Sequence, residues 1–256
     1  ARRAAARDTS LFERMPELVV YPKDAEDVSV IVKEVSRARS AGADVSLTAR
    51  AGGTDMSGGP LTTSIVVSFT KHMNKMGETH VGRGTSYMDG YAMTEPGVYY
   101  RDFEKATMEK SLMLPSYPAS REIAAMGGIV ANNSGGERTL EYGKTEKYVE
   151  ELEVVLSDGS QTTFKSLSPE ELEEKKKLQT LEGKIYREMD ALITENAALI
   201  EQHRPKVSKN SAGYALWSIR DYRTGAFNLA KLICGSQGTL ALWTKAKLSL
   251  VKPKEH

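Results

Sequence analysis

The stretch LTARAGGTDMSGG at residues 47–59 most constrains what this chain can fold into. An apolar run ends at Arg50, and paired glycines with small polar residues follow it. Because glycine readily takes a positive φ, such a segment is a loop whose backbone can lie close to a ligand. Its N–H groups can form an anion nest, to which Arg50, Thr54 and Ser57 would add donors for phosphate oxygens. The stretch predicts a pyrophosphate-binding loop, and a glycine-rich turn without a ligand is the alternative.

Several other classes of site are excluded by motif and composition. No Gly-Lys-Ser/Thr follows the loop, as in an NTPase P-loop, and the spacing is not the GxGxxG of a dinucleotide-binding helix entrance. A net charge of +1 over 256 residues gives no electrostatic reason to expect nucleic acid or an anionic membrane as a partner. No apolar run approaches the roughly 20 residues of a membrane span. The single Cys234 excludes an internal disulfide and argues against a cysteine-based metal site, so we predict no metal and a core position for this residue.

Residues 1–76 are predicted to form a small α/β unit. Strands are expected at 19–21, 45–47 and 65–69, where short apolar runs occur. Between the first two, Asp24 suits a helix N-cap, and apolar residues recur at helical spacing from Val28 to Val35. A helix that crosses between short strands favours a parallel sheet. The second of these strands delivers the chain into the glycine loop.

Residues 77–256 are predicted to form a second, larger unit. Strands are expected at 91–95 and 152–156, a helix from Tyr100 to Lys110, and a hairpin turn at Asp158-Gly159. From 168 to 203 the pattern indicates a charged helical cover with a break expected at Gly183, and a subunit contact is a weaker interpretation. The apolar run 229–234 is expected to be a strand. The whole chain is therefore predicted to have an α+β fold.

Further runs of small residues recur along the second unit. They are PSYPAS at 115–120, AAMGGIVANNSGG at 124–136, KNSAGYAL at 209–216 and GSQGTLAL at 235–242. Two prolines fix the first as an irregular loop, which can form a wall for a flat ligand. Close packing of a helix on a sheet also selects glycine and alanine, and it is the alternative for the second run. Several separate small-residue loops nevertheless favour one extended ligand lying on bare backbone.

In sequence order, these motifs look like one known domain. RAGGTDMSGG, EPGV, PSYPAS, MGGIVANNSGG, LEVVLSDG, NSAGYAL and GSQGTLAL resemble the FAD-binding (PCMH-type) domain of the vanillyl-alcohol-oxidase and p-cresol-methylhydroxylase superfamily. The resemblance is strongest to FAD-linked 2-hydroxy-acid oxidases and dehydrogenases of the glycolate oxidase and D-lactate dehydrogenase kind. It implies an α/β subdomain and a second subdomain with a mainly antiparallel sheet, with FAD between them.

The resemblance also implies which residues contact FAD. The first loop, 50–55, would hold the pyrophosphate with backbone amides, and 118–122 with 125–127 would lie along the flavin. Residues 131–134 would pack on the ribityl and phosphate region, Val155 would hold the adenine edge, and 237–240 would border the flavin. The implied set is Arg50, Ala51, Gly52, Gly53, Thr54, Asp55, Ser57, Pro118, Ala119, Ser120, Glu122, Ala125, Met126, Gly127, Ala131, Asn132, Ser134, Val155, Gln237, Gly238, Thr239 and Leu240.

Departures from the family pattern refine these expectations. Thr54 stands where some members attach FAD covalently through a histidine, so we expect non-covalent binding.

In the family a hydride passes from the hydroxyl-bearing carbon to flavin N5 while a base removes the hydroxyl proton. The residues for a hydroxy-acid substrate, and often the base, belong to a C-terminal cap domain, which we expect to be absent from this chain. The chain begins without Met and stops directly after a strand-like run, so we expect a fragment of a longer protein.

The catalytic residues, the electron acceptor and the acid oxidised are not indicated. His72, His80 and His203 lie outside the glycine motifs, and structural or surface roles are the stronger interpretation. With no apolar signal region we expect a cytoplasmic protein, peripheral to a membrane only if its electron-acceptor partner is. A flavin-binding or scaffold module without turnover of its own is the alternative function.

Overall fold

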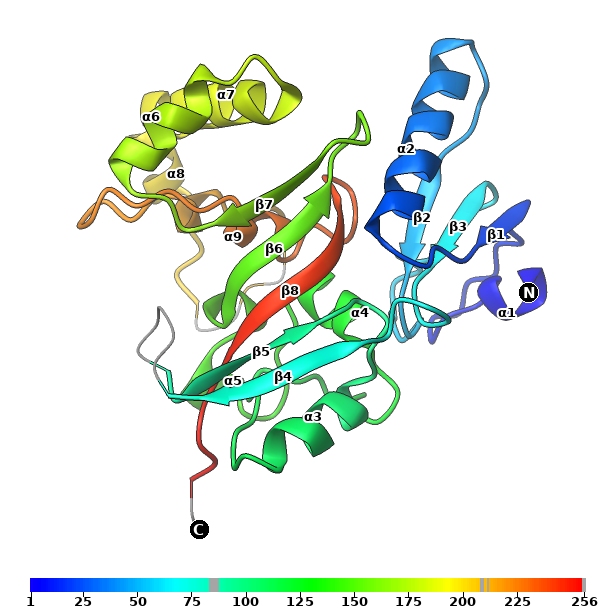
Figure 1. Ribbon diagram of the computed structural model, residues 1–256, viewed down its shortest axis with the longest axis horizontal. Coiled ribbons are helices and arrows are strands. Elements are labelled where there is room, and N and C mark those ends of the chain that lie inside the picture. Colours follow the sequence, from blue (N-terminus) through cyan, green and yellow to red (C-terminus); the bar gives the residue numbers. More distant parts are fainter. Residues whose placement is uncertain (83–87, 208–209, 211, 255–256) are drawn as a thin grey trace.

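The computed structural model describes residues 1–82, 88–207, 210 and 212–254, and the smaller of its sheets lies near the N-terminus (Figure 1). This sheet has the order β1-β3-β2, from β1 (Leu18–Val20), β2 (Leu47–Arg50) and β3 (Ile65–Ser68), and its strands are parallel, as predicted. A short helix, α1 (Arg2–Ala5), precedes it, and α2 (Ala25–Ser40) crosses from β1 to β2. The Asp24 carboxylate caps α2 by accepting a hydrogen bond from the Asp27 N–H at 2.9 Å.

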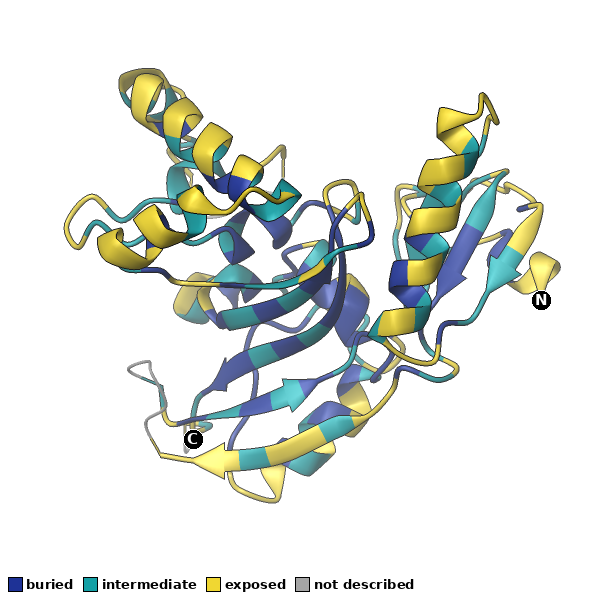
Figure 2. Ribbon diagram, turned by 45° about the horizontal axis from the view of Figure 1, so that its top comes forward, coloured by how far each residue is buried: buried dark blue, intermediate teal, exposed yellow. Residues whose placement is uncertain are grey.

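The larger sheet has the order β4-β5-β8-β6-β7, and all its neighbouring strands are antiparallel. Its strands are β4 (Met76–Val81), β5 (Gly90–Thr94), β6 (Val149–Val155), β7 (Gln161–Lys165) and β8 (Leu242–Leu250). The predicted turn at Asp158-Gly159 joins β6 to β7, with Gly159 at φ +80°. The edge strand β4 is the most exposed of the five (Figure 2). The mixed architecture and the antiparallel sheet confirm the α+β prediction.

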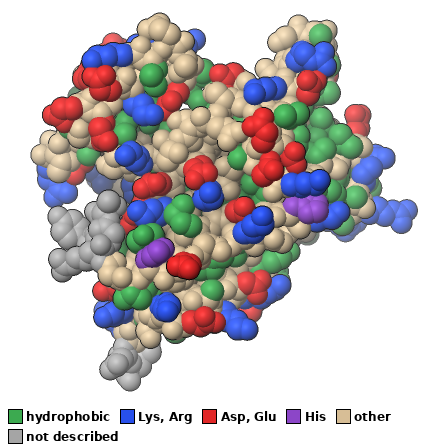
Figure 3. Space-filling view, viewed as in Figure 1, with side chains coloured by type: hydrophobic (Ala, Val, Ile, Leu, Met, Phe, Trp, Pro, Cys, Tyr) green, Lys and Arg blue, Asp and Glu red, His purple; other side chains and the backbone are tan. Residues whose placement is uncertain are grey.

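One face of the larger sheet forms the main hydrophobic core. Alternate residues of β8, Ala246, Leu248 and Leu250, are fully buried on this face, which α3 (Tyr100–Met108) and α4 (Met126–Ala131) cover. On the opposite face, Lys245 and Lys247 of β8 form ion pairs with glutamates of β6. Side chains of both charge signs are interspersed over the side of the molecule seen in Figure 3.

The remaining elements are short, apart from the charged helical cover. Around the core lie α5 (Thr139–Tyr142), η1 (Thr145–Lys147), η2 (Leu216–Ser218) and α9 (Ala230–Ile233). The cover consists of α6 (Pro169–Lys177), α7 (Leu181–Glu195) and α8 (Ala197–Gln202), and a capping box at Ser168 starts it. None of the helices in the described part of the chain has both the length and the apolarity that a membrane crossing needs.

The structure corrects three expectations about local structure. The run 229–234 is not a strand, since its residues form α9, whose Ala230, Leu232 and Ile233 pack into the core. The run 124–136 is not wholly a loop, because α4 lies within it. The helical cover is interrupted at 178–180, before Gly183, which lies in the first turn of α7. A Cβ on Gly183 would lie 2.0 Å from the Leu178 carbonyl oxygen, so glycine there permits close packing.

The two sheets share apolar contacts where they meet. Val28 and Val67 of the smaller unit belong to the same buried cluster as Val155 of β6 and Leu242 of β8. The ends of β6 and β8 therefore pack directly against the N-terminal unit. The division of the chain at residue 76 into two units stays a prediction.

Candidate functional site

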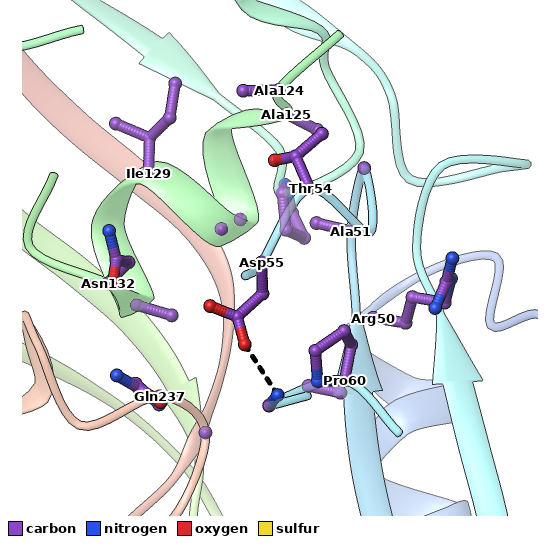
Figure 4. Close-up of a pocket in the computed structure, with 18 of the residues that line it drawn as sticks. Arg50, Ala51, Thr54, Asp55, Pro60, Ala124, Ala125, Ile129, Asn132 and Gln237 are labelled. Atoms are coloured by element: carbon purple, nitrogen blue, oxygen red, sulfur yellow. Dashed lines mark hydrogen bonds between the residues drawn. The ribbon is translucent and has the colours of Figure 1, made fainter. Parts of the chain in front are cut away.

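A cavity of about 490 Å³ lies where the two sheets meet. Its wall is built from the end of β2 and the following loop, from the proline loop at 118–120, from α4 and the residues after it, and from the turn at 236–238 before β8 (Figure 4). Its volume is that of an ordinary ligand site. Four of the five small-residue stretches, which are far apart in sequence, thus converge on one space, and no described residue of 209–216 lines it.

The loop after β2 presents backbone donors to this cavity. Within the described residues, the N–H groups of Gly52, Gly53 and Thr54 donate to no protein acceptor, and all three residues line the cavity. Gly53 has a φ of +68°, which places it in the left-handed region. Unpaired successive N–H groups in a turn favour an anion. The loop therefore offers donors that an anion can use, and its binding of a pyrophosphate stays a prediction.

Asp55 holds this loop in shape. Its carboxylate accepts a hydrogen bond from the Gly59 N–H at 2.6 Å, the dashed line in Figure 4, and another from the Ser57 hydroxyl at 2.9 Å. Its backbone carbonyl accepts one from the Thr9 hydroxyl at 2.8 Å. Because these donors partly offset the negative charge, a carboxylate can stand beside an anion site. The Ser57 side chain therefore binds Asp55, and Ser57 does not line the cavity.

Arg50 is placed differently from the expectation that it donates to phosphate. Its guanidinium donates to the Arg7 carbonyl oxygen at 2.7 Å and lies against Gly53. Figure 4 shows its side chain directed away from Asp55 and Asn132. Burial lowers the pKa of Arg50 from its ordinary value. Arg50 thus ties the N-terminal segment to the glycine loop.

The two glycines at the start of α4 have different surroundings. A Cβ on Gly127 would lie 2.8 Å from the Pro96 carbonyl oxygen and 2.9 Å from the Ala51 Cβ. A Cβ on Gly128 would meet no described atom within 4 Å, and Gly128 lines the cavity. The packing explanation for small residues therefore holds at Gly127, whereas Gly128 leaves space that a ligand can fill.

The turn before β8 completes the cavity and contains an unpaired polar atom. The Gln237 N–H donates to the Ala131 carbonyl oxygen at 2.9 Å, which fixes the turn to the end of α4. Gln237 and Gly238 both have positive φ, at 53° and 77°. Ser236 is 3% exposed, and its hydroxyl oxygen has no partner among the described residues. Because an unpaired buried hydroxyl costs about 1–3 kcal/mol, a ligand with a polar atom fits this position.

Residues 16–165 match the family described as FAD binding domain. The chain belongs to this family. This domain is 30% identical over 250 residues to D-2-hydroxyglutarate dehydrogenase of Pseudomonas putida, covering 98% of the chain but 24% of that protein. It is 30% identical to the glycolate oxidase subunit GlcD of Bacillus subtilis, covering 96% of the chain and 39% of the relative. It is 29% identical to D-lactate dehydrogenase of Archaeoglobus fulgidus, covering 91% and 38%.

The fold of the FAD-binding domain is also found in a solved structure. An alkyldihydroxyacetonephosphate synthase matches with a TM-score of 0.56 at 19% identity, covering 96% of this chain and 34% of that one. The relatives confirm the resemblance to FAD-linked 2-hydroxy-acid oxidoreductases that the motifs indicated. The chain spans about a quarter to two fifths of the length of the three curated relatives.

Most of the residues expected to contact the cofactor are brought together on the cavity wall. Those on the wall are Arg50, Ala51, Gly52, Gly53, Thr54, Asp55, Pro118, Ala119, Ser120, Ala125, Gly127, Ala131, Asn132, Ser134, Gln237 and Gly238. Their contact with FAD stays a prediction. Of the NSAGYAL motif, Ser211 lies outside the described residues, as does the preceding Lys209.

The other expected residues do not line the cavity, for identifiable reasons. Met126 points into the main core, and Val155 into the cluster shared by the two sheets. Glu122 lines a different pocket. The Thr239 hydroxyl donates to the Ser236 carbonyl oxygen at 2.6 Å, and Leu240 is exposed. Ser57, as described above, bonds to Asp55.

Sequence reasoning missed several wall residues. Gly128 and Ser236 stand inside motifs that were recognised, and their neighbours were chosen instead. Thr9, Phe69 and Trp243 come from segments without a small-residue signal. Only their tertiary contacts, such as that from Thr9 to Asp55, bring them to the site.

The cavity wall has few groups that could act in acid–base chemistry. Arg50 and Asp55 are its only charged side chains among the described residues. His72, His80 and His203 lie elsewhere, and His80 stacks on Tyr91 with ring centroids 4.6 Å apart. Within the described ranges, no group of three or more His, Cys, Asp or Glu could hold a metal ion. Among the described residues, the wall therefore offers no histidine for proton transfer.

Proposed function

We propose that this domain binds FAD non-covalently in the cavity and supplies the cofactor half of an oxidoreductase that acts on a 2-hydroxy acid. The observation that carries the binding proposal is the bare cavity wall, where Gly128 leaves space, the Ser236 hydroxyl lacks a partner and a glycine loop presents unpaired N–H groups. The proposed 2-hydroxy-acid substrate is inferred from the relatives, which are named after D-2-hydroxyglutarate, glycolate and D-lactate.

In this proposal each part of the wall has a role. The N–H groups of Gly52 to Thr54 hold the pyrophosphate, and Asp55 keeps that loop in the required shape. Gly128 and Ala131 let the cofactor lie against α4, and the Ser236 hydroxyl finds its partner on FAD. Bound FAD supplies the acceptor for a hydride from the hydroxyl-bearing carbon. Residues 1–76 and 77–256 act as the two subdomains between which it lies.

We further propose that the cofactor is not covalently attached. Thr54 is the residue at the position where a histidine links FAD in some members of the family. Among the described wall residues there is no histidine or cysteine that could form such a bond. Non-covalent binding predicts that acid precipitation of the protein releases all of its flavin into the supernatant, whereas flavin that stays with the pellet contradicts it.

The substrate-binding part and the proton-accepting group are proposed to lie in a cap domain beyond this chain. The share of the relatives' length that the chain covers supports this. The electron acceptor is a separate partner. A cytoplasmic location belongs to the same proposal, and cell fractionation tests it.

Two experiments test the proposal. Purified protein is expected to be yellow, or to become so when FAD is added and excess is removed; a colourless protein that takes up no FAD favours a scaffold without turnover. The natural full-length protein is then mixed with D-2-hydroxyglutarate, glycolate and D-lactate without an acceptor. Bleaching of the flavin by at least one acid is expected, and bleaching by none refutes the substrate class.

A further inference from the structure

A second pocket, of about 480 Å³, shares a wall with the cofactor cavity. The loop at 117–122 contributes Pro118 to Ser120 to the cofactor cavity, and Tyr117 and Arg121 to the second pocket. Cations outnumber carboxylates in the lining of this second pocket. Its charged residues are Arg101, Lys105, Arg121, Arg138, Glu104 and Glu122.

Two of the arginines lie at the same aromatic ring. The guanidinium carbons of Arg121 and Arg138 are 5.0 and 5.9 Å from the centroid of Tyr117. Arg121 has nearby carboxylates, at 3.7 Å in Glu104 and 3.6 Å in Glu122. These distances are longer than those of strong charge-assisted hydrogen bonds, so Arg121 is only partly compensated.

Arg138 has a carboxylate nearby but not in contact: Lys254 and, more weakly, Arg138 lower the pKa of Glu141, whose carboxylate is paired with Lys254. The Arg138 guanidinium donates to the Met113 sulfur at 3.6 Å, and thioether sulfur is a weak acceptor. No carboxylate lies within 4 Å of its guanidinium in the part of the chain that the structure describes. Two like charges beside one ring repel each other, and Arg138 keeps most of its donors available. An anion that joined the two arginines would relieve this repulsion and use the available donors.

We propose that this pocket binds a small dianion, a dicarboxylate or inorganic phosphate, between Arg121 and Arg138 beside Tyr117. The planar fork of a guanidinium matches the oxygens of a carboxylate or a phosphate, so each arginine can hold one edge of the anion. The site is distinct from the cofactor cavity, and its occupation does not require FAD.

Methionine methyl signals provide a local test. Met108 and Met113 line this pocket, whereas Met56 lines the cofactor cavity. The protein is labelled with ¹³C-methyl methionine and titrated separately with succinate and with phosphate at low salt. We expect the Met108 signal to shift saturably with at least one of them, and the anion that binds more tightly identifies the source. The Met56 signal stays in place, and added sodium chloride weakens the binding.

Variants decide whether the arginines hold the anion. Arg138→Gln is expected to raise the dissociation constant about tenfold or more, since it removes a charge-assisted hydrogen bond. Arg204→Gln is the matched control, because Arg204 is exposed, forms an ion pair with Glu201 alone among the described residues, and lines neither pocket. If Arg138→Gln does not fold, Arg121→Gln provides the same comparison. The proposal is overturned if neither anion shifts Met108, or if the folded variant binds as tightly as the control.

Discussion

Replacement of Gly128 by alanine separates folding from cofactor binding in this domain. The residue lies inside α4, where alanine is more favourable than glycine by about 0.5–1 kcal/mol. Its Cβ would meet no described atom within 4 Å, so no packing penalty opposes this gain. The protein without FAD should therefore keep or raise its thermal midpoint, by up to about 2–4 °C.

The same methyl group points into the cavity proposed for FAD. Forcing one extra carbon into a filled site costs about 1–3 kcal/mol, which corresponds to a dissociation constant for FAD raised about 5- to 150-fold. Thermal unfolding without FAD and flavin-fluorescence titration measure the two effects. Gly127→Ala is the matched control, because its Cβ would lie 2.8 Å from the Pro96 carbonyl oxygen and should lower the thermal midpoint. Unchanged FAD affinity in Gly128→Ala would refute the proposed position of the cofactor.

Three further predictions concern single residues. Ser236→Ala removes an unpaired buried hydroxyl, so the protein without FAD should be at least as stable as the unchanged protein. The dissociation constant for FAD should rise about tenfold, because the hydroxyl's proposed hydrogen bond to FAD is lost. A fall in stability with unchanged FAD affinity contradicts this. Arg50→Gln should release the N-terminal segment, which limited proteolysis would detect as faster cleavage before residue 16. The free energy of unfolding, measured in urea, should fall by about 1–3 kcal/mol. Lost FAD affinity without faster cleavage would instead make Arg50 a phosphate ligand. Burial raises the pKa of the Cys234 thiol, so the folded state holds its proton more tightly than an unfolded chain, where the pKa is about 8.5. Iodoacetamide should therefore not modify Cys234 at pH 8 until urea is added, and the free energy of unfolding should decline above about pH 8.5; rapid alkylation of the folded protein would show that this position is not buried.

The elements that the sequence predicted well are those set by local chemistry. The helix capped by Asp24 and the turn at Asp158-Gly159 depend on neighbouring side chains and on glycine's freedom at positive φ, and both were found. Residues 229–234 were wrongly assigned to a strand. A short apolar run has no periodicity that distinguishes a buried helix from a buried strand, so its neighbours in the core decide between them.

The sequence by itself determined that several stretches of small residues leave backbone bare, and the order of those stretches identified an FAD-binding domain. The sequence could not decide which glycines face a ligand site and which pack against protein atoms, because Gly127 and Gly128 are adjacent and chemically identical. Nor could it show that Arg50 binds carbonyl oxygens near the N-terminus, since that contact joins residues 43 apart. Only the tertiary structure fixes what lies beyond each missing side chain, because direction and distance in space follow from how the two sheets pack.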